Sequence, residues 1–339
     1  MSIRLIIGLF AMLLSVAASA QPRLDPGPEP LVLRALSAIR AADADTALKA
    51  VEALRLQYPD YRLGQLLALQ LNAWLAGDTP LLHQLQQRHG ALIEALTQEA
   101  RLRWQHHQQE EKIHRRLHQW ILRPGRQPWW VVVDMTGSRL YLLRNRNGHL
   151  QVVEDVFVSI GQKGYGKQRR GDRRTPVGIY RIVDWLPDEK LPPLYGAGAL
   201  PLNYPNAWDR MLGRTGSGIW LHGTPPGLYV RPPRSSKGCV VLNNDAVEAL
   251  HEVYRLPLGT PVLLVDDLKR VEPLPSTQLT ALARQLPQGA PLARYPGEAG
   301  LWWSGWRTAR GWQERWWRFD GRDWQLALRH TEPVQLARR

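Results

Sequence analysis

The chain has 339 residues, of which 44% are hydrophobic and 22% are charged, so we expect two or three packed domains rather than a disordered polypeptide. The formal net charge of +14 is spread along the sequence and comes with no zinc-finger or RNA-binding motif. We therefore interpret the charge as a solvated basic surface and expect no nucleic-acid partner.

The first 20 residues have the pattern of a secretory signal peptide. Arg4 supplies the positive start, Leu5 to Leu14 form a short apolar run, and Ala18 to Ala20 fit a small-residue cleavage site. The apolar run is shorter than a membrane span requires, although an uncleaved anchor is the alternative. We expect an exported protein that works in the periplasm.

Cysteine usage adds a second clue. Cys239 is the one cysteine of the chain, so no intramolecular disulfide can form. A lone thiol in an exported protein is open to oxidation and indicates a reactive site, whereas a buried structural cysteine is the alternative.

Residues 21–126 are predicted to form a helical domain that resembles short helical repeats. Apolar side chains such as Leu31, Ala35 and Ile39 recur at spacings near 3.6 residues. His114 and His118 are four positions apart, which is a possible spacing for metal ligands. No further ligand motif accompanies them, and we interpret the histidines of this stretch as part of a solvated helix face. The set is His106, His107, His114 and His118.

Residues 127–267 are predicted to form a β-rich domain, because short runs of Val, Ile, Leu and Tyr replace the helical pattern. Asn145 to Gly148 has the composition of a hairpin turn. One helix is expected from Asp245 to Tyr254. The expected strands cover residues 129–134, 138–143, 151–160, 178–183, 219–222, 239–242 and 261–265.

Residues 268–339 are predicted to form a linker and a small β unit. Seven of the 15 tryptophans lie between residues 301 and 328, and Phe319 to Trp324 has the pattern of a hairpin turn between aromatic strands. We interpret the tryptophans as the core of this unit, with a surface for stacking sugars as the alternative. The fold class that follows is multidomain α+β: helical segment, β-rich domain, Trp-rich β unit.

The candidate chemistry lies at the ends of two expected strands. A thiol attacks carbonyl groups as thiolate, and a nearby imidazole can accept its proton or hold it as an ion pair. His222 and Cys239 are 17 positions apart and are joined by a loop rich in Pro and Gly. The turn that precedes Cys239 includes Ser236 and Gly238, and its backbone N–H groups are candidates for stabilising an oxyanion.

This pattern resembles the L,D-transpeptidase catalytic domain of the YkuD type, whose motif is His-Gly, a variable loop and then Ser/Thr-x-Gly-Cys. The resemblance covers residues 128–266. It includes the run from Gly171 to Gly178, which contains Thr-Pro-x-Gly, and the run from Pro201 to Asn206.

The resemblance implies a two-step acyl transfer on the peptide stems of peptidoglycan. Cys239 would attack the carbonyl of the third stem residue and expel the terminal D-Ala, with His222 as base and the turn from Ser236 to Cys239 as oxyanion hole. The acceptor would be an amine of another stem, a lipoprotein lysine or water. No cofactor and no metal are implied. The residues expected to bind substrate are Lys237, Tyr204, Asn203, Gly223 and Arg234.

The sequence departs from the family at two positions. Many members carry His before Gly-Cys, where this chain has Lys237, and many carry Arg two positions after the Cys, where it has Val241. The second departure removes a natural partner for the stem carboxylate, which Lys237, Arg234 or Arg214 could replace.

Three alternatives stay open on sequence grounds. The protein could hydrolyse the same bonds, as an L,D-carboxypeptidase or a lipoprotein–peptidoglycan amidase, or it could be a non-catalytic cell-wall-binding scaffold. A phosphate-binding loop is a weaker candidate. Gly161 to Lys167 has its spacing, but Gln168 replaces the Ser or Thr that would bind magnesium, so we interpret this run as a mobile basic loop.

Overall fold

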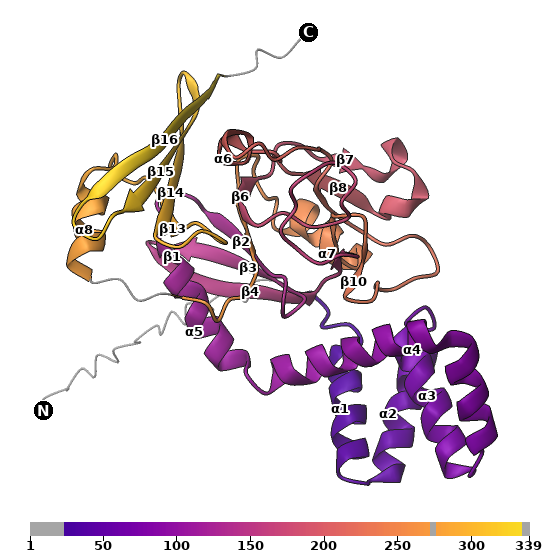
Figure 1. Ribbon diagram of the computed structural model, residues 1–339. Coiled ribbons are helices and arrows are strands. Elements are labelled where there is room, and N and C mark those ends of the chain that lie inside the picture. Colours follow the sequence, from indigo (N-terminus) through magenta and orange to yellow (C-terminus); the bar gives the residue numbers. More distant parts are fainter. Residues whose placement is uncertain (1–23, 272–275, 334–339) are drawn as a thin grey trace, which may run out of the picture.

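The computed structural model describes residues 24–271 and 276–333, and the expected signal peptide lies outside them. The architecture is multidomain α+β, as predicted, with a helical segment, a central β-rich domain and a C-terminal β unit (Figure 1). Among the described helices, none is long and apolar enough to cross a membrane.

Five helices build the N-terminal segment, which confirms the helical pattern. Asp43 and Asp78 cap α2 and α4, because their side chains accept hydrogen bonds from the backbone N–H groups of Thr46 and Leu81. The buried faces follow the 3.6-residue spacing. The helices are α1 (Glu29–Arg40), α2 (Ala44–Gln57), α3 (Arg62–Leu75), α4 (Thr79–His107) and α5 (Glu110–Trp120).

The histidines of α4 and α5 do not share one solvated face, contrary to the sequence interpretation. His107 and His118 are exposed, whereas His106 is buried and His114 half-buried. The last two contact Asp155 of the neighbouring sheet. The spacing of residues along one helix does not reveal this contact, because Asp155 comes from a strand distant in sequence.

The central domain contains two main sheets, and every strand predicted there is found with small shifts of its ends. The larger sheet has the order β4-β3-β2-β12-β6, and the smaller has β11-β9-β8-β7. The larger sheet consists of β2 (Trp129–Asp134), β3 (Arg139–Arg146), β4 (His149–Phe157), β6 (Gly178–Arg181) and β12 (Pro261–Val265). The smaller consists of β7 (Leu186–Pro187), β8 (Gly198–Pro201), β9 (Trp220–His222) and β11 (Val240–Val241).

Short elements complete this domain. The predicted hairpin turn joins β3 to β4, with Asn147 and Gly148 at positive φ. The expected late helix is found as α7 followed by one π-helical turn over residues 249–253. The remaining elements are β5 (Ile160–Gly161), which pairs with β10 (Arg234–Ser236), the helices α6 (Ala207–Met211) and α7 (Asn244–Glu248), and the short turns η1 (Asp188–Lys190) and η2 (Pro193–Tyr195).

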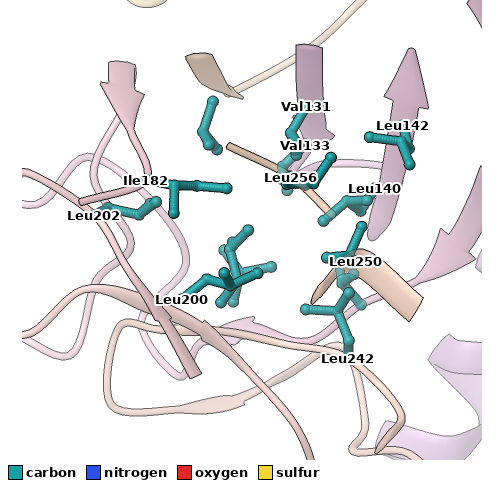
Figure 2. Packing of buried hydrophobic residues seen from close by; sticks show 14 of the residues in the cluster. Val131, Val133, Leu140, Leu142, Ile182, Leu200, Leu202, Leu242, Leu250 and Leu256 are labelled. Atoms are coloured by element: carbon teal, nitrogen blue, oxygen red, sulfur yellow. The ribbon is translucent and has the colours of Figure 1, made fainter. Parts of the chain in front are cut away.

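Both faces of the larger sheet are buried, because alternate side chains of a strand point to opposite faces. Val131 and Val133 of β2 face the smaller sheet and pack with Leu200 and Leu242 in the core drawn in Figure 2. Val132, between them, faces the other side. This arrangement explains the continuous apolar run of β2.

The C-terminal unit covers that other side. Trp303 and Trp316 pack with Trp130 of β2, and the rings of Trp130 and Trp303 meet edge to face at 6.3 Å. Six of the seven clustered tryptophans are buried, which confirms the core interpretation over a sugar-stacking surface. The unit consists of β13 (Leu292–Arg294), β14 (Leu301–Thr308), β15 (Gly311–Phe319), β16 (Trp324–Pro333) and α8 (Ser276–Arg284), and β13 pairs with β1 (Ile121–Arg123).

Candidate active site

His222 and Cys239 are brought together by parallel pairing of β9 with β11. The register pairs Val241 with His222 and Val240 with Leu221, and Cys239 directly precedes β11. Because side chains alternate along a strand, Cys239 and Val241 are on the same face, next to His222. The 17-residue separation in sequence therefore becomes a short diagonal across two neighbouring strands.

The hydrogen bond of His222 determines which ring nitrogen carries the proton. Nδ1 lies 2.7 Å from the carbonyl oxygen of Gly223, and a carbonyl can only accept, so Nδ1 must be the donor. Nε2 is then unprotonated in the neutral ring and available as a base. His222 is 4% exposed, and its ring meets that of Tyr195 in a T-shaped contact with the ring centroids 5.0 Å apart.

The charge state of His222 follows from its burial. The pKa of His222 is lowered to about 4, mainly by desolvation and in smaller part by the positive charge of Arg231, while the hydrogen bond to Gly223 opposes the shift. The imidazole is therefore neutral at pH 7. A resting ion pair with the thiol is disfavoured.

Cys239 is half-buried, and its thiol donates to the carbonyl oxygen of Gly218 at 3.3 Å. Desolvation raises the pKa of the Cys239 thiol, whereas the backbone N–H of Trp220 and the charges of Arg231 and Lys167 oppose this rise. The resting site therefore holds a neutral thiol beside a neutral imidazole, and the thiolate has to form during attack.

The turn before Cys239 is fixed by internal hydrogen bonds. The hydroxyl of Ser236 donates to the carbonyl oxygen of Cys239 at 2.6 Å and accepts from the backbone N–H of Gly238 at 3.1 Å. The hydroxyl of Thr175 donates to the carbonyl oxygen of Gly238 at 3.0 Å and accepts from the N–H of Gly161 at 2.9 Å. Ser236 thus shapes the turn. The N–H of Cys239 has no hydrogen bond within the described part of the chain.

Glycine is required at two positions of the site. Gly238 has a φ of 133°, and a Cβ there would lie 2.8 Å from the carbonyl oxygen of Arg174. A Cβ at Gly223 would lie 2.1 Å from Oδ1 of Asn244. The amide of Asn244 accepts from the N–H of Thr224 and donates to its carbonyl, so it holds the segment after His222 in place.

The other expected substrate residues divide into two groups. Lys237 and Arg234 are exposed beside the turn. Asn203 and Tyr204 have contacts within the protein: Oδ1 of Asn203 accepts from the N–H of Arg181 at 2.8 Å, and the hydroxyl of Tyr204 donates to the carbonyl of Thr215 at 3.1 Å.

Two residues of the site were missed by sequence reasoning. Tyr195 packs on His222, and Arg231 acts electrostatically on both His222 and Cys239. Within the described residues Arg231 has no hydrogen bond or ion pair, and its Nε is buried without a partner. Arg214, one of the cations considered as a carboxylate partner, instead pairs with Asp209 at 3.0 Å.

The basic loop from residue 161 to 176 is held by Asp172. Its carboxylate accepts from Nζ of Lys167 at 2.8 Å and from the backbone N–H groups of Gln168, Arg169 and Arg174. The amine of Lys167 is buried in this ion pair. The loop is therefore tied to an internal carboxylate, and no helix begins where a phosphate-binding loop would need one.

The family model of the L,D-transpeptidase catalytic domain, YkuD, matches residues 128–264. A structure of Bd1075 from Bdellovibrio bacteriovorus is similar at 20% identity and a TM-score of 0.50, covering 64% of this chain and 98% of that one. The helical cell shape determining protein Pgp2 from Campylobacter jejuni is similar at 17% identity and a TM-score of 0.47, over 62% and 94% of the two chains. An L,D-transpeptidase from Xylanimonas cellulosilytica is similar at 20% identity and a TM-score of 0.28, covering 41% of this chain and 60% of that one. No curated protein matches.

Proposed function

Residues 128–264 form an L,D-transpeptidase catalytic domain of the YkuD family, and from that premise we propose that the protein transfers acyl groups between peptidoglycan stems through a thioester on Cys239. The domain makes the chain a peptidoglycan-acting enzyme. The observation that carries the finer proposal is the 2.7 Å contact of His222 Nδ1 with the carbonyl oxygen of Gly223, which leaves Nε2 free on the face of the strand pair that also bears Cys239.

The reaction begins with proton transfer from the thiol to Nε2 of His222. The sulfur attacks the peptide carbonyl of the third stem residue, and the carbonyl oxygen becomes an oxyanion. When the tetrahedral intermediate collapses, the C–N bond breaks and His222 returns the proton to the nitrogen of the leaving D-Ala. The acceptor amine of a second stem then attacks the thioester, gives its proton to His222 and restores the thiol.

We assign the backbone N–H of Cys239 as the oxyanion donor. It has no hydrogen-bond partner in the described chain, whereas the N–H of Gly238 is already bonded to Ser236. The bonds of Ser236 and Thr175 fix the direction of this donor before substrate arrives. Such preorganised donors stabilise a developing negative charge without reorganisation cost.

We assign Arg231 as the partner of the stem carboxylate. Many family members carry an arginine two positions after the cysteine, but this chain has Val241 there, and the side chain of Val241 is fully buried. Arg231 lies close enough to Cys239 to act on the pKa of its thiol and has no ion pair within the described residues. A guanidinium without a partner is suited to a carboxylate. Lys237 and Arg234, exposed beside the turn, extend the same positive surface.

Incubation of tetrapeptide muropeptides with the purified protein, followed by mass spectrometry, tests the reaction. We expect dimers that lack one D-Ala with the wild type and with His149→Gln, an exposed histidine of β4, and none with Cys239→Ala or His222→Gln. Shortened monomers without dimers would show that the protein hydrolyses the stem and does not transfer it. Unchanged muropeptides would contradict both and favour the scaffold.

Export to the periplasm and a lipoprotein lysine as acceptor belong to the same proposal. Peptidoglycan lies outside the inner membrane, which agrees with the signal-peptide pattern of the first 20 residues. Fractionation of cells that express the full chain tests export. Adding a lipoprotein to the muropeptide reaction tests the acceptor, because a covalent lipoprotein–stem product would then form.

A further inference from the structure

A second cluster of polar side chains lies where α5 meets β4, outside the site of Cys239. Glu110 and His114 are one helical turn apart at the start of α5, and Asp155 lies on β4. One ligand atom from each lies within 4.8 Å of the others. The sequence spacing considered for a metal joined His114 to His118, but His118 is exposed and does not belong to this cluster.

We propose that Glu110, His114 and Asp155 bind a divalent transition-metal ion, with zinc as the best match. One imidazole and two carboxylates form a donor set that suits zinc, and three protein ligands leave a fourth position for water. Calcium and magnesium prefer oxygen ligands alone, so the imidazole argues against them. Bringing the three atoms to zinc-bonding distance requires side-chain shifts of about 1 Å or less.

Unpartnered polar atoms around the cluster give independent support. Nε2 of His114 is buried without a hydrogen-bond partner, since its nearest carboxylate oxygen, Oδ2 of Asp155, is 3.6 Å away. The hydroxyl of Tyr141 is also buried without a partner, and Tyr141 is fully buried beneath His114, with ring centroids 5.9 Å apart. Buried polar groups are normally hydrogen-bonded, so a missing ligand accounts for both atoms.

A neighbouring imidazole holds Asp155 in position. Nε2 of His106 lies 2.6 Å from Oδ2 of Asp155 and orients it, as outer partners do in metal sites.

Arg139 is the one feature of this cluster that disfavours a cation. Its Nη1 lies 3.5 Å from Oδ1 of Asp155, and the guanidinium is also paired with Glu29 of α1. Because Arg139 approaches Oδ1 whereas the imidazoles approach Oδ2, the metal would take the second oxygen. The charge of Arg139 is shared with Glu29, which reduces its repulsion of an ion.

The place of the cluster points to a structural clasp. Asp155 pairs with Tyr141 across β3 and β4, on the sheet face that α5 covers through Ile113 and Leu117 (Figure 1). The strands of the active site belong to the other sheet. An ion here would join the helical segment to the central domain and take no part in the chemistry of Cys239.

Metal binding is tested on the untagged full chain after removal of metals with a chelator. The background is Cys239→Ala, so that the thiol cannot bind the ion. Calorimetric titration with Zn²⁺ is expected to give one bound ion per chain. Thermal unfolding with Zn²⁺ present is expected to give a higher Tm, because binding to the folded state stabilises it. Co²⁺ is expected to give visible absorption bands of a low-symmetry site.

Matched variants locate the ion. His114→Gln is expected to abolish binding, and His106→Gln to weaken it about tenfold or more by releasing Asp155. His118→Gln, one turn further along α5 and exposed, is the control and keeps full affinity. No saturable binding in the background protein, or equal affinity in His114→Gln with an unchanged circular dichroism spectrum, would overturn the proposal.

Discussion

At the scale of single residues, the proposed chemistry depends on the resting protonation of the Cys239–His222 pair. Burial shifts the two pKa values apart, with the thiol above its ordinary value and the imidazole at about 4. Between these values the thiol is protonated and the imidazole is neutral. This is the form that general-base catalysis requires, because His222 can take the proton during attack.

The pH dependence of alkylation tests this state. A raised thiol pKa moves thiolate formation to higher pH, so the rate of reaction of Cys239 with iodoacetamide is expected to be low at pH 7 and to rise past the ordinary thiol pKa of about 8.5. Acyl transfer by the free enzyme should persist down to about pH 4 and fall below it as His222 is protonated. Full alkylation rates at pH 6 would show an ion pair instead.

Substitution of Arg231 tests the carboxylate partner. Arg231→Met keeps an unbranched side chain and removes the charged guanidinium, so we expect kcat/KM for tetrapeptide stems to fall by about tenfold to hundredfold, mostly through KM. Arg322→Met, in the exposed turn before β16, serves as the control. A stem whose terminal carboxyl is amidated should lose the difference between wild type and Arg231→Met, and a persistent difference would contradict the assignment.

The sequence indicated the proposed nucleophile and base of the candidate site, but it could not indicate Arg231. Cys239 and His222 belong to a spaced motif at strand ends, where local patterns carry information. Arg231 lies in an irregular loop of the segment between β9 and β10. Its approach to the thiol depends on the path of that loop, so the cations first considered were those adjacent in sequence or in the motif.

At the scale of elements, the turn that carries Cys239 depends on a residue from a different loop. The hydroxyl of Thr175 bridges Gly161, on β5, and Gly238, before Cys239. β5 also pairs with β10, which leads into the same turn. The Thr-Pro-x-Gly run of the sequence therefore has a physical role, which is to position the turn.

Thr175→Val is expected to remove both bonds at nearly constant volume. Leaving the buried N–H of Gly161 and carbonyl of Gly238 without partners costs about 1–3 kcal/mol for each group, so the free energy of unfolding and kcat should both fall. Thr331→Val, at an exposed position of β16, should change neither. Urea denaturation measures the free energy of unfolding of both variants, and turnover assays measure their kcat. A kcat of Thr175→Val equal to that of the wild type would refute the positioning role.

Strands β2, β3, β4, β6 and β12 could be predicted because each buries an alternating or continuous apolar run, whereas the shorter β9 and β11 were predicted from the apolar residues next to His222 and Cys239. The very short strands β5, β7, β8 and β10 carry no such period and escaped prediction. Strand order also escaped prediction, because the pairing of β12 with β2 and β6 joins segments 80 or more residues apart in sequence. A local sequence pattern predicts that a strand forms, but not which strand it pairs with.

At the scale of the whole molecule, the C-terminal unit forms a continuous core with the central domain. Trp303 is 1% exposed, packs on Trp130, and donates from Nε1 to Glu314 at 3.1 Å. β1, from the end of the N-terminal segment, pairs with β13 of the same unit. We propose domain limits at residues 126–127 and 267–268, with β1 crossing from the first part to the third.

Trp303→Ala tests this coupling. Removing the indole leaves a cavity and removes a hydrogen-bond donor to Glu314. We therefore expect the free energy of unfolding to fall by about 3–5 kcal/mol, with the central domain destabilised together with the C-terminal unit. Trp306→Ala, at a half-buried position of the same strand, should cost less. Two separate unfolding transitions, with the central one unchanged, would contradict a shared core.

The most direct test of the central claim is to observe the thioester itself. The wild type and Cys239→Ala are mixed with a tetrapeptide stem, quenched in acid within the first turnovers and analysed by intact-mass and peptide mass spectrometry. We expect an added mass equal to the stem without its terminal D-Ala, located on Cys239 and absent from Cys239→Ala. Turnover of the stem by Cys239→Ala, or by a wild type that never carries the adduct, would contradict it.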